Sequence, residues 1–212
     1  MLIFNIAAMK RNKILLIMGL ITFLSLSGCS PEGDIKTPYL RPMIFMEDFS
    51  VGAKDNITLA TPNWENIAEV GTAKWKAQVY NGNAYAEFTS YQSGNLTNIG
   101  WLVSPKINMD AQEGEKLEFI TSQSYVSDSA NSLEVLIATD YDGTNLTTAN
   151  WQPAGAILPS TSSAYFLFIK SGLIDLSGYT GNINIAFKVK GSGTNPALDG
   201  GYQIDNIRIY NN

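Results

Sequence analysis

The chain has 212 residues, with 14 basic residues against 19 acidic ones, a formal net charge of −5, no histidine and one cysteine. An acidic chain without a basic cluster argues against a nucleic-acid partner, and the absence of histidine excludes imidazole bases, Ser-His triads and His-ligated zinc. A hydrophobic content of 45% is enough for a sizeable core, so a folded domain is expected rather than disorder.

Residues 1–28 have the organisation of an export signal. Lys10, Arg11 and Lys13 precede the uncharged run 14–26, which is shorter than the roughly 20 apolar residues of a membrane-spanning helix. The run ends in Leu-Ser-Gly-Cys at residues 26–29, and together with Ser-Pro-Glu-Gly-Asp at 30–34 it resembles a bacterial lipoprotein signal of the Bacteroidetes type. That resemblance implies an acylated, palmitate-bearing Cys29 that anchors the protein in the outer membrane, facing the cell surface. The alternative is a free thiol after an ordinary secretory signal.

Residues 29–42 hold three prolines and no apolar periodicity, which predicts a flexible tether. Signal cleavage would change the formal charge from −5 to −8, because three basic residues are lost. A chain this acidic is not expected to bind anionic lipid electrostatically. The acyl group would therefore have to hold the protein at the membrane. Residues 43–212 contain no internal repeat and no second linker, and they are predicted to form one domain.

The rest of the chain reads as short strands separated by turn residues. The clearest is 183–190, where Ile183, Ile185, Phe187 and Val189 alternate with the other four residues, as expected for a strand with one buried face. Further strands are predicted at residues 43–49, 83–89, 100–103, 117–123, 133–139, 165–171 and 203–210. No long helical period occurs after the signal. These strands predict an all-β fold, an antiparallel β-sandwich of jelly-roll type.

Several segments between residues 45 and 209 form an ordered set. They are Phe-Met-Glu-Asp-Phe at 45–49, Trp64, Gly-Trp-Leu-Val-Ser-Pro-Lys-Ile at 100–107, Leu-Glu-Phe at 117–119, the segment 133–143, Ile-Asp-Leu-Ser at 174–177, Ile-Ala-Phe-Lys at 185–188 and Tyr-Gln-Ile-Asp-Asn-Ile at 202–207. The set resembles choice-of-anchor J domains, which are related to the cleaved adhesin domains of gingipains. The resemblance implies a jelly-roll module of surface adhesins and carbohydrate-binding proteins, without specifying one chemical function.

Two carboxylates fall on apolar strand faces if the strands are regular. Asp205 would share a face with Ile207 and Ile209, and Glu47 would share one with Phe45 and Phe49. A buried carboxylate is costly unless it is paired, hydrogen-bonded or bound to a cation. Calcium accepts six to eight oxygen ligands, so a structural calcium site is predicted from Glu47, Asp48, Asp205 and Asn206. The resembled family is associated with calcium. The alternative is that Asp205 caps a turn or bulge.

Catalytic motifs are scarce. The sequence has no Gly-x-Ser-x-Gly elbow, no Ser-x-x-Lys pair and no phosphate-binding glycine loop. A glycosidase needs only two carboxylates, and the strand residues Glu87, Glu118 and Glu134 could line a groove. The alternative for each is an ordinary solvent-facing strand residue. The prediction is therefore that the protein is not an enzyme.

Aromatic residues give the better functional signal. Trp75, Tyr80, Tyr85 and Tyr91 surround an Asn-Gly-Asn turn and a Ser/Asn-rich segment, and Trp151 is a second candidate near Asn150 and Gln152. An aromatic ring beside amide side chains suits a sugar, since the ring stacks on its apolar face while the amides bind its hydroxyls. The alternative is that these rings form the core, as is expected for Trp64 and Trp101.

Together these features predict a surface-anchored lipoprotein with a non-catalytic binding module for a glycan or protein ligand. Its partners would be the membrane, through the N-terminal lipid, and that ligand, but no nucleic acid. One alternative is a glycan-degrading enzyme that uses paired carboxylates. Another is a structural or assembly subunit of a cell-surface complex, for which a broad apolar patch is expected.

Overall fold

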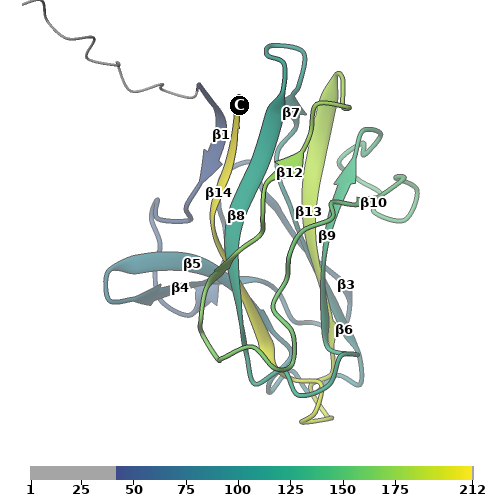
Figure 1. Ribbon diagram of the computed structural model, residues 1–212. Coiled ribbons are helices and arrows are strands. Elements are labelled where there is room, and N and C mark those ends of the chain that lie inside the picture. The colour runs from purple at the N-terminus through teal and green to yellow at the C-terminus, as the bar shows by residue number, and fades with distance from the viewer. Residues whose placement is uncertain (1–41, 212) are drawn as a thin grey trace, which may run out of the picture. The chain divides into compact units, whose positions relative to one another are not determined.

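The computed structural model describes residues 42–211, which form two antiparallel β-sheets packed face to face (Figure 1). The predicted signal peptide, Cys29 and the predicted tether up to residue 41 lie outside the described residues. Residues 42–211 contain no helix, and therefore none that could cross a membrane. The predicted antiparallel β-sandwich of jelly-roll type is confirmed.

The larger sheet has eight strands in the order β11-β8-β14-β5-β4-β2, with β1 paired to β14 and β12 paired to β8. One edge of β14 pairs with β8, and the other pairs first with β5 at residues 201–204 and then with β1. The strands are β1 (Met43–Glu47), β2 (Ile57–Thr58), β4 (Lys76–Tyr80), β5 (Asn83–Thr89), β8 (Glu115–Ser124), β11 (Ile169–Lys170), β12 (Ile174–Asp175) and β14 (Gly201–Asn211).

The smaller sheet has six strands in the order β10-β9-β13-β6-β3, with β7 paired to β13. In Figure 1 this layer, with β9 and β13, lies to the right of the layer that holds β8 and β14. The strands are β3 (Glu65–Val70), β6 (Asn98–Val103), β7 (Ile107–Asn108), β9 (Ser132–Ala138), β10 (Gln152–Pro153) and β13 (Asn182–Gly191).

The main core lies between the two sheets. As the alternation predicts, Ile183, Ile185, Phe187 and Val189 of β13 are all fully buried in it. Phe187 meets Phe119 of the opposite sheet edge-on, with ring centroids 5.3 Å apart. Burial of each such side chain contributes about 1.5–3 kcal/mol, so this layer of contacts is the main attraction between the sheets.

Phe88 of β5 and Gly100 of β6 make the closest approach between the sheets. The ring of Phe88 lies directly on the Gly100 backbone, so that a Cβ atom at position 100 would overlap the ring edge and lie 2.7 Å from Cζ. Trp75 packs on the same ring, with centroids 5.7 Å apart. Phe88 is fully buried and therefore has no open space into which it could move.

A second hydrophobic cluster covers the outer face of the six-stranded sheet. It contains Trp101 and Ala186 from the sheet. Tyr141 and Trp151 join it from residues 139–151, the segment that links β9 to β10. The ring centroid of Trp151 lies 5.4 Å from that of Trp101 and 5.4 Å from that of Tyr141. This segment therefore covers Trp101 and Ala186, which a ligand on that face of the sheet could not reach.

Candidate functional site

Strand β5 supplies the centre of the candidate site. Its apolar residues Ala86 and Phe88 are fully buried in the core between the sheets. Because side chains alternate along a strand, the residues between them point to the outer face of the eight-stranded sheet. These outward residues are Asn83, Tyr85, Glu87 and Thr89.

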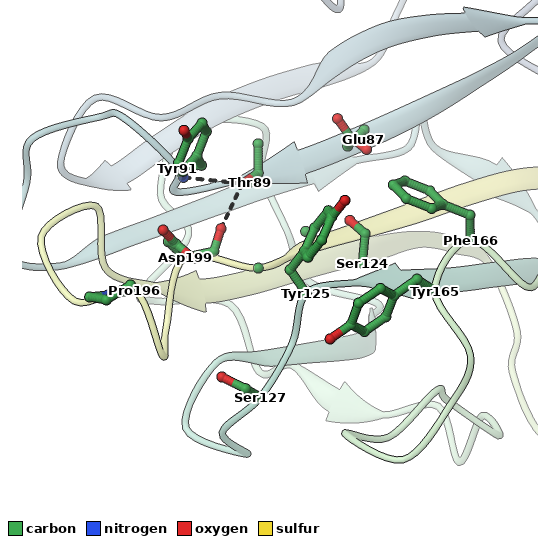
Figure 2. Close-up of a pocket in the computed structure, with 12 residues that line it drawn as sticks. Glu87, Thr89, Tyr91, Ser124, Tyr125, Ser127, Tyr165, Phe166, Pro196 and Asp199 are labelled. Carbon is green, nitrogen blue, oxygen red and sulfur yellow. Dashed lines mark hydrogen bonds between the residues drawn. The ribbon is translucent and has the colours of Figure 1, made fainter.

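Two hollows open on this outer face, with volumes of about 670 Å³ and about 580 Å³. Both volumes are typical of small-molecule sites. Phe166 lines both hollows, so they adjoin, and together we call them the groove. The larger hollow, part of which Figure 2 shows, is lined by Glu87, Thr89, Tyr91, Ser124, Tyr125, Ser127, Tyr165, Phe166, Pro196, Asp199, Gly200 and Gly201. The smaller hollow is lined by Tyr80, Asn83, Tyr85, Phe166 and Phe168.

The floor of the larger hollow is a row of small residues. Thr89, Gly201 and Ser124 stand opposite one another on β5, β14 and β8. A Cβ atom at Gly201 would lie 3.1 Å from the Ser124 hydroxyl oxygen and 3.3 Å from the Phe88 carbonyl oxygen. The middle of the row has no side chain, so the floor is open to a ligand.

An aromatic wall, made of Tyr125, Tyr165 and Phe166, stands over one side of this floor. The ring centroids of Tyr125 and Tyr165 are 4.8 Å apart, and Phe166 meets Tyr125 edge-on at 6.2 Å. In Figure 2 the wall lies near Ser124, and Tyr91 lies across from it. Tyr125 and Phe166 both have a φ of 58°. This left-handed conformation is costly for a bulky residue, and such strain concentrates at functional sites.

Gln123 holds the aromatic wall in place. Its side-chain amide donates to the Ser163 carbonyl at 2.6 Å, and its side-chain oxygen accepts from the Val126 N–H at 3.0 Å. Its own backbone carbonyl accepts from the Phe166 N–H at 2.8 Å. The fully buried Gln123 thus ties the segment before Phe166 to the chain that carries Tyr125.

The smaller hollow lies along the first half of β5. Tyr85 packs edge-on against Phe168, with ring centroids 5.6 Å apart, and Tyr80 stands at the end of β4. Desolvation by burial is the main cause that raises the pKa of Tyr85, and the nearby charges of Glu87 and Asp55 add to it. Tyr85 is therefore a neutral phenol at physiological pH, able to donate or accept a hydrogen bond.

A polar network fixes the side chain of Glu87 between the two hollows. The Gln203 amide donates to Glu87 Oε2 at 2.7 Å, and the Gln78 amide donates to Oε1 at 2.9 Å. Gln203 is fully buried and is itself oriented, because its oxygen accepts from the Ser122 hydroxyl at 2.7 Å. The sequence left open whether Glu87 lines a groove or is an ordinary solvent-facing residue, and in the structure it lines the groove.

The structure brings together three of the five aromatic residues predicted to bind a ligand. Tyr80, Tyr85 and Tyr91 all line the groove. Trp75 does not, because it is fully buried in the core against Phe88, and its prediction as a ligand-binding residue is wrong. Trp151 lies in the cluster on the outer face of the other sheet, where its indole N–H donates to the Leu146 carbonyl at 3.0 Å. Trp151 is partly buried there, so the prediction that it is an exposed ring is wrong.

The aromatic wall was missed in the sequence. The run Tyr-Phe-Leu-Phe at residues 165–168 belongs to the predicted strand 165–171, but only Ile169 and Lys170 pair with a neighbouring strand. The positive φ of Phe166 interrupts extended structure there. The turn-rich stretch before it, which includes three serines in residues 160–163, is the signal that could have indicated a loop.

The predicted calcium residues surround the point where β14 changes its neighbour from β5 to β1. Asn206 has a φ of 53°, and the register between β14 and β8 shifts between Asp205 and Arg208. This β-bulge reverses the alternation, so that Ile204 and Ile207 both enter the core and Asp205 lies on the outer face. The premise that Asp205 shares a face with Ile207 and Ile209 is wrong for that reason.

Glu47 lies on the other face of the sheet. It pairs with Ile207, and paired residues point to the same side, so Glu47 points inward with Phe45. Its Oε1 accepts from the Phe49 N–H at 2.6 Å. The structure thus separates Glu47 from Asp205, because the bulge turns Asp205 outward.

Asp205 itself is buried, with 1% of its surface exposed, and it accepts hydrogen bonds from Asn83 and Asn206. Burial is the main cause that raises its pKa, and the charge of Asp48 also raises it, whereas the hydrogen bonds oppose the rise. Within residues 42–211 no group of three or more Asp, Glu, Cys or His side chains is arranged to hold a metal ion. Asp48 is close enough to Asp205 for its charge to raise that pKa, and a calcium ion beside the two carboxylates would need backbone and amide oxygens for most of its ligands.

No protein-family model matches the sequence, and no curated protein matches it. Solved structures similar to it include two cleaved adhesin domains of Lys-gingipain. One is 14% identical with a TM-score of 0.50, covering 79% of this chain and 99% of that domain. The other, from Porphyromonas gingivalis, is 16% identical with a TM-score of 0.50, covering 80% and 99%. A xylan-binding domain from Paenibacillus barcinonensis is 14% identical with a TM-score of 0.43, covering 80% and 99%. At these identities the likeness to the adhesin domains establishes the fold alone.

Proposed function

We propose that the protein is a non-catalytic binding module that holds a glycan chain in the groove. One observation carries the proposal: within residues 42–211, every exposed aromatic side chain lines the groove. The five rings range from 50% exposed for Phe166 to 70% exposed for Tyr80, and the others are Tyr91, Tyr125 and Tyr165. Large aromatics normally enter the core, so five of them at the surface on one face point to a ligand.

The chemistry of the groove suits a sugar. The exposed rings offer flat apolar faces to the C–H faces of pyranose rings. Between them the floor offers the hydroxyls of Thr89 and Ser124 and the carboxylate of Glu87, which can exchange hydrogen bonds with sugar hydroxyls. The outward residues of β5 extend over about 20 Å at the rise of a β-strand, which is room for several sugar units.

The alternatives are less well supported. A glycan hydrolase needs one carboxyl group free to give up a proton, whereas both oxygens of Glu87 already accept amide hydrogen bonds. An assembly subunit would offer a broad apolar face, whereas this groove has a polar floor. A protein ligand remains an outcome of the experiment below.

A glycan array tests the proposal. The wild-type protein is expected to bind a set of glycans, and Tyr125→Ala and Tyr165→Ala are each expected to weaken binding roughly tenfold, because each removes a stacking surface. Leu96→Ala is the matched control, since Leu96 is exposed but does not line the groove. An empty array, or equal binding by all four proteins, would contradict the proposal.

The module would be held at the outer membrane surface by lipid on Cys29, with residues 29–42 as its tether and 43–212 as the domain. The support is the order of basic, apolar and Leu-Ser-Gly-Cys segments in residues 10–29. We expect the natively expressed protein to partition into the detergent phase and Cys29→Ala to remain in the aqueous phase. Equal partitioning of the two would contradict the anchor.

A calcium ion bound by Asp48 and Asp205 would stabilise the β1–β14 junction. Calcium at 100 times its Kd would add about 2.7 kcal/mol, so chelation should lower the Tm by about 5–10 °C. Asp205→Asn should remove this sensitivity, whereas Glu134→Gln, on the other sheet, should keep it. Without calcium, the raised pKa of Asp205 means that stability falls as pH rises through that pKa, because the folded state holds the proton more tightly. A chelator that leaves the wild-type Tm unchanged would exclude the ion.

A further inference from the structure

Glu87 is a prepared hydrogen-bond acceptor inside the groove. An ionised carboxylate offers about four acceptor positions, two on each oxygen. The amides of Gln78 and Gln203 occupy one position on each oxygen, at 2.9 and 2.7 Å. One position on each oxygen therefore remains for a ligand.

Gln203, one of the two donors that hold Glu87, is itself fixed. The Ser122 hydroxyl donates to Gln203 Oε1, which forces the Gln203 nitrogen to face Glu87, and that nitrogen also donates to the Ser124 hydroxyl oxygen at 3.0 Å. Gln203 and Ser122 are both fully buried. The carboxylate is thus oriented before a ligand arrives, which lowers the entropy cost of binding.

Glu87 forms no ion pair with a cation among the described residues. The groove is lined by two carboxylates, those of Glu87 and Asp199, and by no lysine or arginine. Lys76 stands opposite Glu87 in the β4–β5 ladder, but its ammonium group donates to Asn56 at 2.9 Å and forms no ion pair with Glu87. A ligand that carries carboxylate, sulfate or phosphate groups would meet uncompensated negative charge.

Two hydroxyl groups on neighbouring carbons of a sugar ring are close enough to reach both oxygens of one carboxylate. Hydrogen bonds to an ionised acceptor are stronger than those between neutral groups. We propose that Glu87 selects the ligand: the groove takes a neutral glycan, one sugar of which donates two vicinal hydroxyls to the Glu87 carboxylate. This inference rests on the proposed function, because it assigns the class of glycan that the same groove accepts.

The test uses isothermal titration calorimetry on the wild-type protein and Glu87→Gln. The probes are gluco-, manno-, xylo- and galacto-oligosaccharides, with galacturono-oligosaccharides as the charged match of the galacto series. We expect the wild type to bind a neutral series and to bind the uronates at least tenfold more weakly. Glu87→Gln should lose at least about tenfold in affinity for the neutral ligand, as expected for hydrogen bonds to a charged group. Glu134→Gln, an exposed carboxylate of β9, should bind like the wild type.

Deoxygenated ligands provide a second measurement that needs no mutation of the chain. Removal of either vicinal hydroxyl should weaken binding to the wild type and cause no further loss in Glu87→Gln. Equal affinity of wild type and Glu87→Gln, or uronates that bind as tightly as neutral sugars, would overturn the assignment of Glu87. In those cases weaker binding by Tyr125→Ala would still support the groove as a glycan site. If the wild type binds none of the probes and the glycan array is also empty, the proposed function fails as well.

Discussion

Gly100→Ala is expected to lower the Tm of the protein by about 2–12 °C. The added methyl group would overlap the Phe88 ring, which is fully buried and already packed against Trp75. Overpacking of this kind costs about 1–3 kcal/mol or more, and 1 kcal/mol corresponds to about 2–4 °C in a domain of this size. Thermal unfolding followed by circular dichroism measures the change.

Two further variants identify the cause. Gly178→Ala is the matched control, because no atom lies within 4 Å of its Cβ position and its φ is not positive, so its Tm should stay near the wild-type value. Phe88→Leu should partly restore stability in the Gly100→Ala background, since the smaller side chain leaves room for the methyl group. If the double variant is as unstable as the sum of the two single changes, the close approach of the sheets is not the reason.

Gln123→Ala is expected to destabilise the fold by about 2–5 kcal/mol and to weaken glycan binding. The substitution leaves the buried Val126 N–H and the partly buried Ser163 carbonyl without their partner. An orphaned buried group costs about 1–3 kcal/mol, and a partly buried one costs less. It also removes both side-chain bonds that link the two segments of the aromatic wall and leaves only the backbone bond from the Phe166 N–H to the residue 123 carbonyl, so the spacing of the Tyr125 and Phe166 rings is expected to loosen. Urea unfolding measures the first effect, and titration with a glycan identified on the array measures the second.

Gln123→Glu separates the two hydrogen bonds, because it retains the acceptor for Val126 and loses the donor to Ser163. Because the new carboxylate would be buried and would face the Ser163 carbonyl oxygen, a stability no higher than that of Gln123→Ala is expected at neutral pH. Gln152→Ala is the surface control: Gln152 is exposed and bonds only to Asn150, so its removal should change stability by less than about 0.5 kcal/mol. Unchanged binding by a folded Gln123→Ala would show that the wall does not depend on this residue.

Strands were predictable from the sequence wherever one face of the strand is buried in the core and the other is exposed to solvent. The predicted strand 83–89 has the bounds of β5, and the predicted strands 183–190 and 133–139 fall within one residue of β13 and β9. Strand β3 was missed because its burial does not alternate, and its residues are intermediate or exposed throughout. The predicted strand at 165–171 failed because an apolar run resembles a buried strand, although these rings are exposed.

The candidate site was only partly predictable for a related reason. Tyr80, Tyr85 and Tyr91 are neighbours in the sequence and lie on one hairpin and its exit, so a local pattern brings them together. Tyr125 and Tyr165 join them through the pairing of β8, β14 and β5 and through the tertiary contacts of Gln123, which no local pattern reveals. Likewise, the bulge at Asn206 depends on one residue with a positive φ, which the sequence does not reveal. Because of this bulge, Asp205 lies on the outer face of the sheet whereas Ile207 points into the core. Trp75 is close to the tyrosines in sequence but falls on the inward face.

The most direct test of the central claim is an NMR titration of the ¹⁵N-labelled domain with a neutral oligosaccharide that the array identifies. The amides of Tyr91, Tyr125, Phe166 and Gly201 are expected to shift together and to saturate with one Kd. Shifts centred on Trp151 and the segment 139–151, with none in the groove, would show that the ligand binds the other sheet and would contradict the account.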